Sequence, residues 1–384
     1  MTSFVALTAR VGAFAVLTAL ALPLAAQEDD APLPEPPPLA GAAPGQAVAP
    51  PPVVNPGEPA IGRLQIFEDW AVGCDNRLSC SAVSLVPEGA GTAYSVLVTI
   101  QRAGGPEGAG LLRLIAADQL RGKIDLIADN NPLKRIKVRG DTIEITGPEA
   151  VAMIRTLGSS YAFELREKQR VIDAPSLRGL PDALRYMDEQ QGRVGSQGAL
   201  AAIGDARPDM ARPVPPEPVV TAGGAVASDA PPPALTPEEQ TAARRLAVCE
   251  GRLENDYPLE THDLDGAHAL VLLPCNAGAY NVSAVPLIGS GGPGHWQFRI
   301  ARFDHAPGFT GDPGTPPLIV NARWNPVKRE LSSFAKGRGL GDCGTAETYK
   351  WDGDLFRLTE ARAMPVCRGA WEWPVLYSAG AAQG

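Results

Sequence analysis

The sequence predicts a mainly β fold with a few short helices, in which two disulfide-containing antiparallel β domains, sandwich- or barrel-like, are joined by a Pro-rich linker. Short apolar stretches that alternate with Gly, Pro, Asn and Asp predict the strands. Two Pro-rich segments without hydrophobic periodicity separate two blocks of ordinary domain length. We expect a signal peptide over 1–26, a Pro-rich disordered segment over 27–61, β-rich domains over 62–205 and 235–378, a linker over 206–234, and a disordered tail over 379–384.

The first 26 residues have the pattern of a secretory signal. Arg10 precedes an apolar run from Val11 to Leu24, and the small residues Ala25 and Ala26 follow it. This run is shorter than the roughly 20 residues that a membrane span requires. We therefore expect cleavage after Ala26, export to the periplasm and no stable membrane insertion of the mature chain. An uncleaved N-terminal anchor is the alternative.

Charge excludes some partners and no motif indicates a cofactor. The formal net charge is −9 and the isoelectric point is about 5.1. Nucleic acids and anionic lipids bind surfaces with clustered Lys and Arg. Because the chain is acidic, neither is expected as a partner. The partner that we expect is an unknown envelope protein or ligand, and we expect no cofactor.

Six cysteines follow the predicted signal, and an oxidising compartment favours their pairing. The spacing contains no C-x-x-C pair and no His beside a Cys, so we expect no metal and disfavour zinc. Sequence alone leaves 15 connectivities open. Proximity along the chain favours Cys74–Cys80, Cys249–Cys275 and Cys343–Cys367.

The first block begins with strands on either side of the Cys74–Cys80 loop. Alternation around Gly140-Asp141 predicts a hairpin with its turn there. Pro148 and Pro181 lie near the starts of two helical patterns. The strands expected in this block are 64–67, 70–72, 82–85, 94–100, 108–116, 123–127, 136–139, 142–145 and 161–165, with helices near 148–157 and 180–191.

The second block begins with a helix from Thr236 to about Cys249. Thr236 and Glu239 have the spacing of a capping box, and Pro237 suits the first helical position. The strands expected after it are 269–273, 280–286, 296–303, 318–324, 330–334, 345–351 and 355–358.

Four motifs resemble those of a bacterial exported family, domain-of-unknown-function family 1176. They are Phe67–Asn76, Met187–Arg193, Cys275–Asn281 and Lys336–Gly344, the last followed by Tyr349–Gly353 and Cys367–Gly369. More loosely, the first block resembles invasion-associated locus B proteins. The resemblance implies a periplasmic location and supplies no established activity.

The Gly-rich stretch Lys336–Gly344 is the first candidate for a ligand site. Lys336 and Arg338, with backbone N–H groups, could bind an anion, and Asp342 and Arg368 are possible neighbours. The alternative is a tight, disulfide-bound loop that requires glycine for its backbone angles.

A second cluster contains His262, Asp263, Asp265 and His268, but its spacing matches no metal signature, and a solvated loop is the alternative. The sequence contains no G-x-S-x-G elbow, and paired cysteines are not nucleophiles. It therefore predicts no catalytic set and favours a non-catalytic binding or interaction module of the envelope. The alternatives are a hydrolase-like enzyme that uses His268, or Asp342 with Arg338, and a structural envelope protein.

Overall fold

The structure is a computed structural model that describes residues 57–90, 96–223, 233–249, 253, 257–308 and 315–383. These residues belong to one compact unit, Pro52–Gly384. The predicted signal peptide and most of the Pro-rich segment after it lie outside the described residues. Antiparallel strands dominate, with three α-helices in the described ranges, which confirms the predicted fold class.

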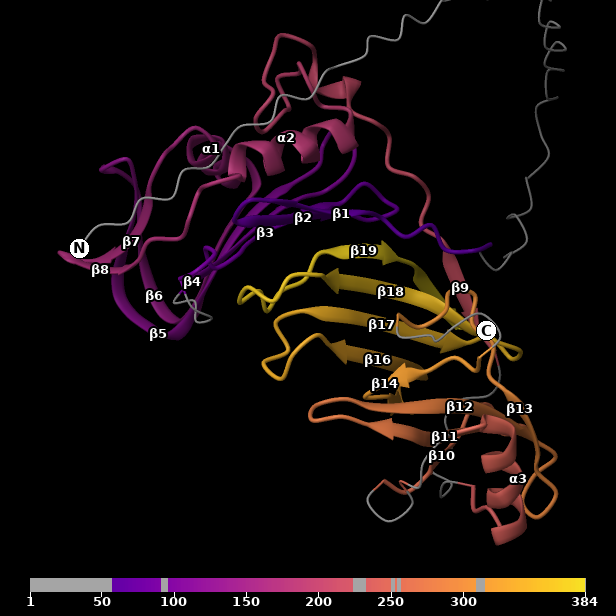
Figure 1. Ribbon diagram of the computed structural model, residues 1–384. Coiled ribbons are helices and arrows are strands. Elements are labelled where there is room, and N and C mark those ends of the chain that lie inside the picture. The colour runs from indigo at the N-terminus through magenta and orange to yellow at the C-terminus, as the bar shows by residue number, and fades with distance from the viewer. Residues whose placement is uncertain are drawn as a thin grey trace, which may run out of the picture. The chain divides into compact units, whose positions relative to one another are not determined.

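The first block contains an eight-stranded sheet in the order β1-β2-β3-β4-β5-β7-β8, with β6 paired to β5 (Figure 1). Its strands are β1 Leu64–Phe67, β2 Trp70–Cys74, β3 Cys80–Ser84, β4 Val96–Arg102, β5 Gly110–Ala128, β6 Asn131–Thr146, β7 Phe163–Glu167 and β8 Arg170–Asp173. Because β2 is buried along its whole length, both faces of the sheet must be covered here.

The expected hairpin turn at Gly140-Asp141 is wrong. Strand β6 continues through Gly140, which pairs with Leu120 of β5 and has φ 144°. The β5–β6 pairing shifts register between Ile115 and Leu120. Gly140 therefore lies at an irregularity within a long strand and not at a reversal of the chain. The reversal instead lies at Asp129 and Asn130, which both have positive φ.

Two helices cover one face of this sheet. Helix α1, Gly147–Gly158, packs on β5 and β6, and α2, Leu180–Gln191, packs on β1, β2 and β3 (Figure 1). Leu157, Leu180 and Leu184 of these helices join the largest apolar core of the described residues. The opposite face is covered by residues from the end of the chain, including Met364 and Trp373.

The second block contains two five-stranded sheets. One has the order β10-β11-β12-β13 with β14 on β12, and the other the order β15-β16-β17-β18-β19. Their bounds are β10 Glu260–Asp263, β11 His268–Ala277, β12 Val282–Ser290, β13 Gln297–Ile300, β14 Ile319–Val320, β15 Arg323–Asn325, β16 Glu330–Lys336, β17 Gly344–Trp351, β18 Phe356–Met364 and β19 Val375–Ser378.

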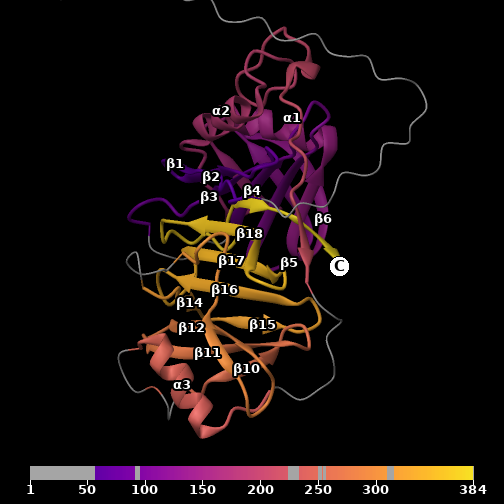
Figure 2. The same cartoon turned by 90° about the vertical axis from the view of Figure 1, so that its right-hand side faces the viewer.

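Residues of these two sheets belong to one apolar core. Figure 2 shows β16–β18 above β10–β12 in the same part of the molecule. Leu270 and Ile288 of one sheet pack with Tyr349 and Phe356 of the other. Helix α3, Pro237–Ala247, covers the outer side of the β11–β12 pair. The capping box forms at its start, with Thr236 Oγ1 accepting from the Glu239 amide.

Part of the expected linker is packed. After the 3₁₀ helix η1, Pro208–Met210, strand β9, Val219–Ala222, pairs in parallel with β20, Gly380–Gln383. Val220 is fully buried there. Backbone pairing with the end of the chain therefore holds 219–222, which lies within the expected linker.

Three disulfides join Cys74 to Cys80, Cys249 to Cys275 and Cys343 to Cys367. Cys74 and Cys80 are register partners at the ends of β2 and β3. None of the three helices in the described ranges has the length and apolar character that a membrane crossing requires.

Candidate functional site

The Gly-rich loop Lys336–Gly344 is tight and held by its own backbone. The Gly337 amide donates to the Cys343 carbonyl at 2.7 Å, and the Gly341 amide donates to the Arg338 carbonyl at 3.0 Å. A Cβ added to Gly344 would lie 1.8 Å from the Ala335 oxygen. The glycines therefore serve backbone conformation and close packing around the disulfide.

Arg338 and Asp342 form a two-point ion pair within this loop. Arg338 Nε donates to Asp342 Oδ1 at 2.7 Å, and Arg338 Nη2 donates to Oδ2. Asp342 is fully buried and also accepts from the Gly369 amide at 2.7 Å. Burial raises the pKa of Asp342, but the bonds from Arg338 and Gly369 outweigh it and hold the pKa below the usual value. Arg338 and Asp342 therefore neutralise each other within the loop.

Arg368 is bound to the first block. Its Nε donates to the Val86 carbonyl at 2.8 Å, Nη1 donates to the Glu68 carbonyl at 2.7 Å, and Nη2 forms an ion pair with Asp69. Asp69 is buried and accepts from the Ser176 hydroxyl at 2.7 Å. These contacts give Arg368 a role in holding the two blocks together.

Lys336 differs from the other three sequence candidates. Its ammonium has no hydrogen bond or ion pair to a described residue. It lines a cavity of about 420 Å³, together with Phe334, Leu340, Arg362, Trp371 and Trp373. We call this cavity the aromatic groove. Arg338, Asp342 and Arg368 are not among its lining residues.

Strand register builds the floor of the aromatic groove. Phe334 and Lys336 are two residues apart on β16 and therefore face the same side. Phe334 pairs with Ala346 of β17, which pairs with Arg362 of β18. The indole of Trp373 stacks on Phe334 with ring centroids 5.2 Å apart.

Glu372 fixes the remaining wall of the groove. Its carboxylate accepts from the Thr99 hydroxyl at 2.8 Å and from Arg113 Nη1 at 3.0 Å, on β4 and β5. This anchor holds the adjacent Trp371 in a position where 53% of its surface remains exposed. These tryptophans were not singled out from the sequence. The alternation of Trp371, Glu372 and Trp373 was the signal that could have indicated two aromatic side chains on one wall.

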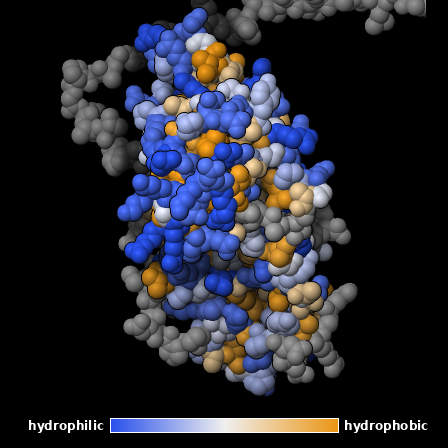
Figure 3. Space-filling view, turned by 90° about the vertical axis from the view of Figure 1, so that its left-hand side faces the viewer, coloured by the Kyte–Doolittle hydropathy of each residue, from blue (hydrophilic) through white to orange (hydrophobic). Residues whose placement is uncertain are grey.

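The aromatic groove includes apolar side chains that are partly exposed to solvent. The face drawn in Figure 3 is mainly hydrophilic, and its apolar residues lie in small separate groups. Leu340 is 50% exposed and Phe334 36% exposed, beside Trp371. An apolar surface with charged neighbours is typical of an interaction site.

The second sequence candidate divides into separate pairs. His268 Nδ1 lies 2.8 Å from Asp265 Oδ2, which also accepts from Trp351 Nε1 at 2.9 Å. Burial raises the pKa of Asp265, but the hydrogen bonds from Trp351 and His268 lower it by more than burial raises it. The pKa of Asp265 is therefore below its usual value. His262 lies 3.4 Å from Glu260 instead, and burial lowers its pKa.

His268 and the Arg338–Asp342 pair belong to different hydrogen-bonded groups. Within the described ranges, no hydrogen bond or ion pair joins His268 to Arg338 or Asp342, and no group of three or more His, Cys, Asp or Glu residues is placed to hold a metal ion. The Asp265 carboxylate orients His268 against the Trp351 ring, 5.6 Å between centroids. The pair therefore anchors the loop before β11 to the second sheet.

Comparison with known proteins identifies relatives without an assigned activity. The profile of a family described as "Protein of unknown function (DUF1176)" matches residues 64–380. The "Uncharacterized protein YpfG" of Escherichia coli (strain K12) is 31% identical over 342 residues, which cover 81% of this chain and 91% of the relative. No solved structure matches the chain. The matched range includes every residue of the aromatic groove.

Proposed function

Because the chain belongs to the DUF1176 family of proteins of unknown function, its activity has to be inferred from its own residues, and we propose that it is a non-catalytic binding module of the bacterial cell envelope. The aromatic groove is the observation that carries this proposal. Trp and Arg are enriched among the residues that dominate binding energy in protein interfaces. The groove presents Trp371, in the segment before β19, together with Arg362 of β18, a strand that contributes Leu358 and Ala361 to an apolar core.

The occupant that fits the groove is a segment of another envelope protein with an apolar side chain next to a carboxylate. The rings of Phe334, Trp371 and Trp373 supply an apolar wall. Lys336 has an uncompensated ammonium at the edge, whereas the carboxylate of Glu372 is already bound to Thr99 and Arg113. The available charge is therefore positive, and it is complementary to an acidic partner.

Export to the periplasm is part of the same proposal. The signal-like pattern of Met1–Ala26 and the three disulfides support an oxidising compartment. The intact mass of the protein isolated from cells tests it. We expect a mature chain that begins at Gln27 and retains three disulfides. A full-length, reduced chain would contradict this location.

Site-specific photocrosslinking in cells tests the groove. A benzophenone amino acid replaces Trp371 in one strain and Val327 in another, because Val327 is 88% exposed and lies in the turn at the far end of β16. We expect one discrete protein adduct from position 371 that disappears in the Lys336→Gln background. Equal adducts at both positions, or none from position 371, would contradict the proposal.

Affinity measurement then extends the test to the purified partner. Trp371→Ala should weaken the dissociation constant at least roughly 30-fold, since truncating a central aromatic residue costs about 2 kcal/mol or more. Val327→Ala should leave it unchanged. A partner that binds Trp371→Ala with wild-type affinity does not use the groove.

A further inference from the structure

A second cavity, of about 450 Å³, lies in the first block, away from the aromatic groove. It is formed by the end of β4, the turn before β5, the start of α1 and the loop after α2. Its lining includes Arg102, Arg155, Val151 and Ala152. We call this cavity the arginine pocket.

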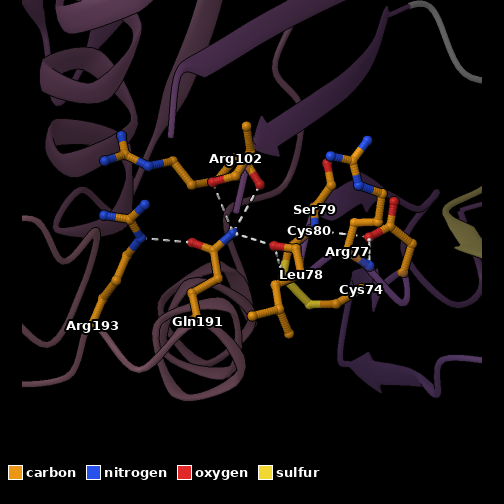
Figure 4. The surroundings of a disulfide bond; sticks show 10 residues. Cys74, Arg77, Leu78, Ser79, Cys80, Arg102, Gln191 and Arg193 are labelled. Atoms are coloured by element: carbon orange, nitrogen blue, oxygen red, sulfur yellow. Dashed lines mark hydrogen bonds between the residues drawn. A yellow bond between two sulfur atoms is a disulfide. The ribbon is translucent and has the colours of Figure 1, made fainter. Parts of the chain in front are cut away.

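Arg102 is buried without a partner. Only 6% of its surface is exposed, and its side chain forms no hydrogen bond or ion pair with any described residue. Its Nε is completely buried and unsatisfied. The backbone of Arg102 is fixed by pairing with Cys80 and Gly110, and its carbonyl accepts from Gln191 Nε2 at 2.8 Å (Figure 4). The strand thus holds a cation at the wall of the cavity.

Arg193 lies on the same side of Gln191 as the Arg102 guanidinium (Figure 4). It is fully buried, its Nε donates to Gln191 Oε1 at 2.8 Å, and its Nη2 donates to the Gly105 carbonyl. Its Nη1 is buried without a partner. A Cβ on Gly198 would lie 3.1 Å from this nitrogen, so glycine keeps the space next to it open.

Positive charge is in excess around this pocket. Burial, followed by repulsion from Arg193 and Arg155, lowers the pKa of Arg102 to about 10, which leaves it charged at neutral pH. The opposing carboxylate is Asp188, which is fully buried and accepts from the amides of Leu200, Ala201 and Ala202.

Arg102 and Arg155 line the pocket, and neither forms an ion pair with a described residue. Arg155 donates only to backbone carbonyls, those of Ala199 and Gln197, so its charge is not neutralised. Glu107 also lines the pocket, but it is exposed and forms no ion pair with a described residue.

The start of α1 adds to this potential. Gly147 and Pro148, the first residues of this 12-residue helix, line the pocket. Thr146 precedes them and makes no side-chain capping bond. The positive end of the helix dipole therefore acts in the same direction as the arginines.

We propose that the arginine pocket binds a small organic phosphate monoester. Two uncompensated cations match a dianion, and the planar guanidinium fork is suited to phosphate oxygens. The walls contributed by Val151, Ala152, Pro106 and Pro148 are apolar, and the cavity exceeds the size of a bare phosphate ion. The ligand therefore carries an apolar body as well as the phosphate. This site is independent of the aromatic groove.

Calorimetric titration of the full mature chain tests the ligand class with three probes. Phenyl phosphate has both the dianion and the apolar body, inorganic phosphate lacks the body, and benzoate has the body with a single charge. We expect phenyl phosphate to bind at least about tenfold more tightly than either of the others, with an affinity that falls as salt rises. Equal affinities, or no heat of binding from any probe at about 10 mM, would overturn the proposal.

Two variants distinguish a ligand site from a structural role. Arg102→Gln should weaken phenyl phosphate at least about tenfold, since a charge-assisted hydrogen bond is lost. It should also unfold at the same or higher urea concentration without ligand, because a buried, unpaired cation has been removed. Arg139→Gln, which removes an exposed charge from the same block, is the control and should change neither quantity.

The second variant keeps all three arginines. Ala152→Phe fills the pocket from an exposed position on α1, so it should abolish binding while the fold persists. It decides the matter if Arg102→Gln does not fold. Wild-type affinity in Ala152→Phe, or lower stability of Arg102→Gln together with wild-type affinity for phenyl phosphate, would show that the arginines are structural.

Discussion

Arg368→Ala should destabilise the protein by about 3–5 kcal/mol, the range for breaking one partner of a buried ion pair. The side chain of Arg368 is 16% exposed and that of its partner Asp69 only 4%. The substitution removes the charge pair and leaves the carbonyls of Val86 and Glu68 without their donor. Each of those bonds contributes about 1 kcal/mol net, and the charged one contributes more.

Urea unfolding followed by circular dichroism measures this loss. Arg178→Ala is the matched control, because Arg178 forms an exposed ion pair with Glu68, 73% and 54% exposed, and should change stability by less than about 1 kcal/mol. A double-mutant cycle with Asp69→Asn should give a coupling energy of about 1–3 kcal/mol. If Arg368→Ala unfolds like Arg178→Ala, or if the cycle shows no coupling, the structural role assigned to Arg368 is wrong.

Three further outcomes follow from single features. Burial raises the pKa of Glu347, so the folded state loses stability as pH rises through that pKa. Glu347→Gln should therefore raise the melting temperature more at pH 8 than at pH 4. An equal effect at both pH values would contradict this. Replacing Cys343 and Cys367 with Ala should lower the free energy of unfolding by about 3 kcal/mol, measured against the oxidised wild type, and a loss below about 1 kcal/mol would contradict the loop-entropy estimate. Gly344→Ala should prevent the Cys343–Cys367 disulfide, because the Cβ of the new alanine would collide with the Ala335 carbonyl. Mass spectrometry should detect free thiols in this variant. A fully oxidised variant would contradict this prediction.

Local signals predicted local structure well. The capping box of Thr236 and Glu239 requires only residues three apart, and it forms as expected. The pattern around Gly140 also predicted extended structure correctly, but the turn was misplaced. Whether glycine lies at a chain reversal or at a register shift depends on the partner strand. The register partner of Gly140 is Leu120, 20 residues earlier in the chain.

Features that depend on distant residues could not be predicted. Val219–Ala222 is short and follows a Pro-rich stretch, and its partner strand is the end of the chain, which is distant in sequence. Arg102 follows the apolar strand residues and resembles an ordinary charged strand end; its burial arises from α1, α2 and the loop after them. Lys336 was identified from the sequence, but two of its aromatic neighbours, Trp371 and Trp373, lie far along the chain, in the segment before β19.

The second face of the first sheet has a consequence for the order of folding. Ala71, Val83 and Leu97 on that face pack against Met364, Ala370 and Trp373, close to the end of the chain. The first block is synthesised early, yet its apolar face has no cover until the last residues arrive. During that interval the face is a surface for self-association or for a chaperone. A chain that stops before residue 364 would keep this face exposed permanently, so premature termination should produce an aggregating protein and not a shorter soluble one.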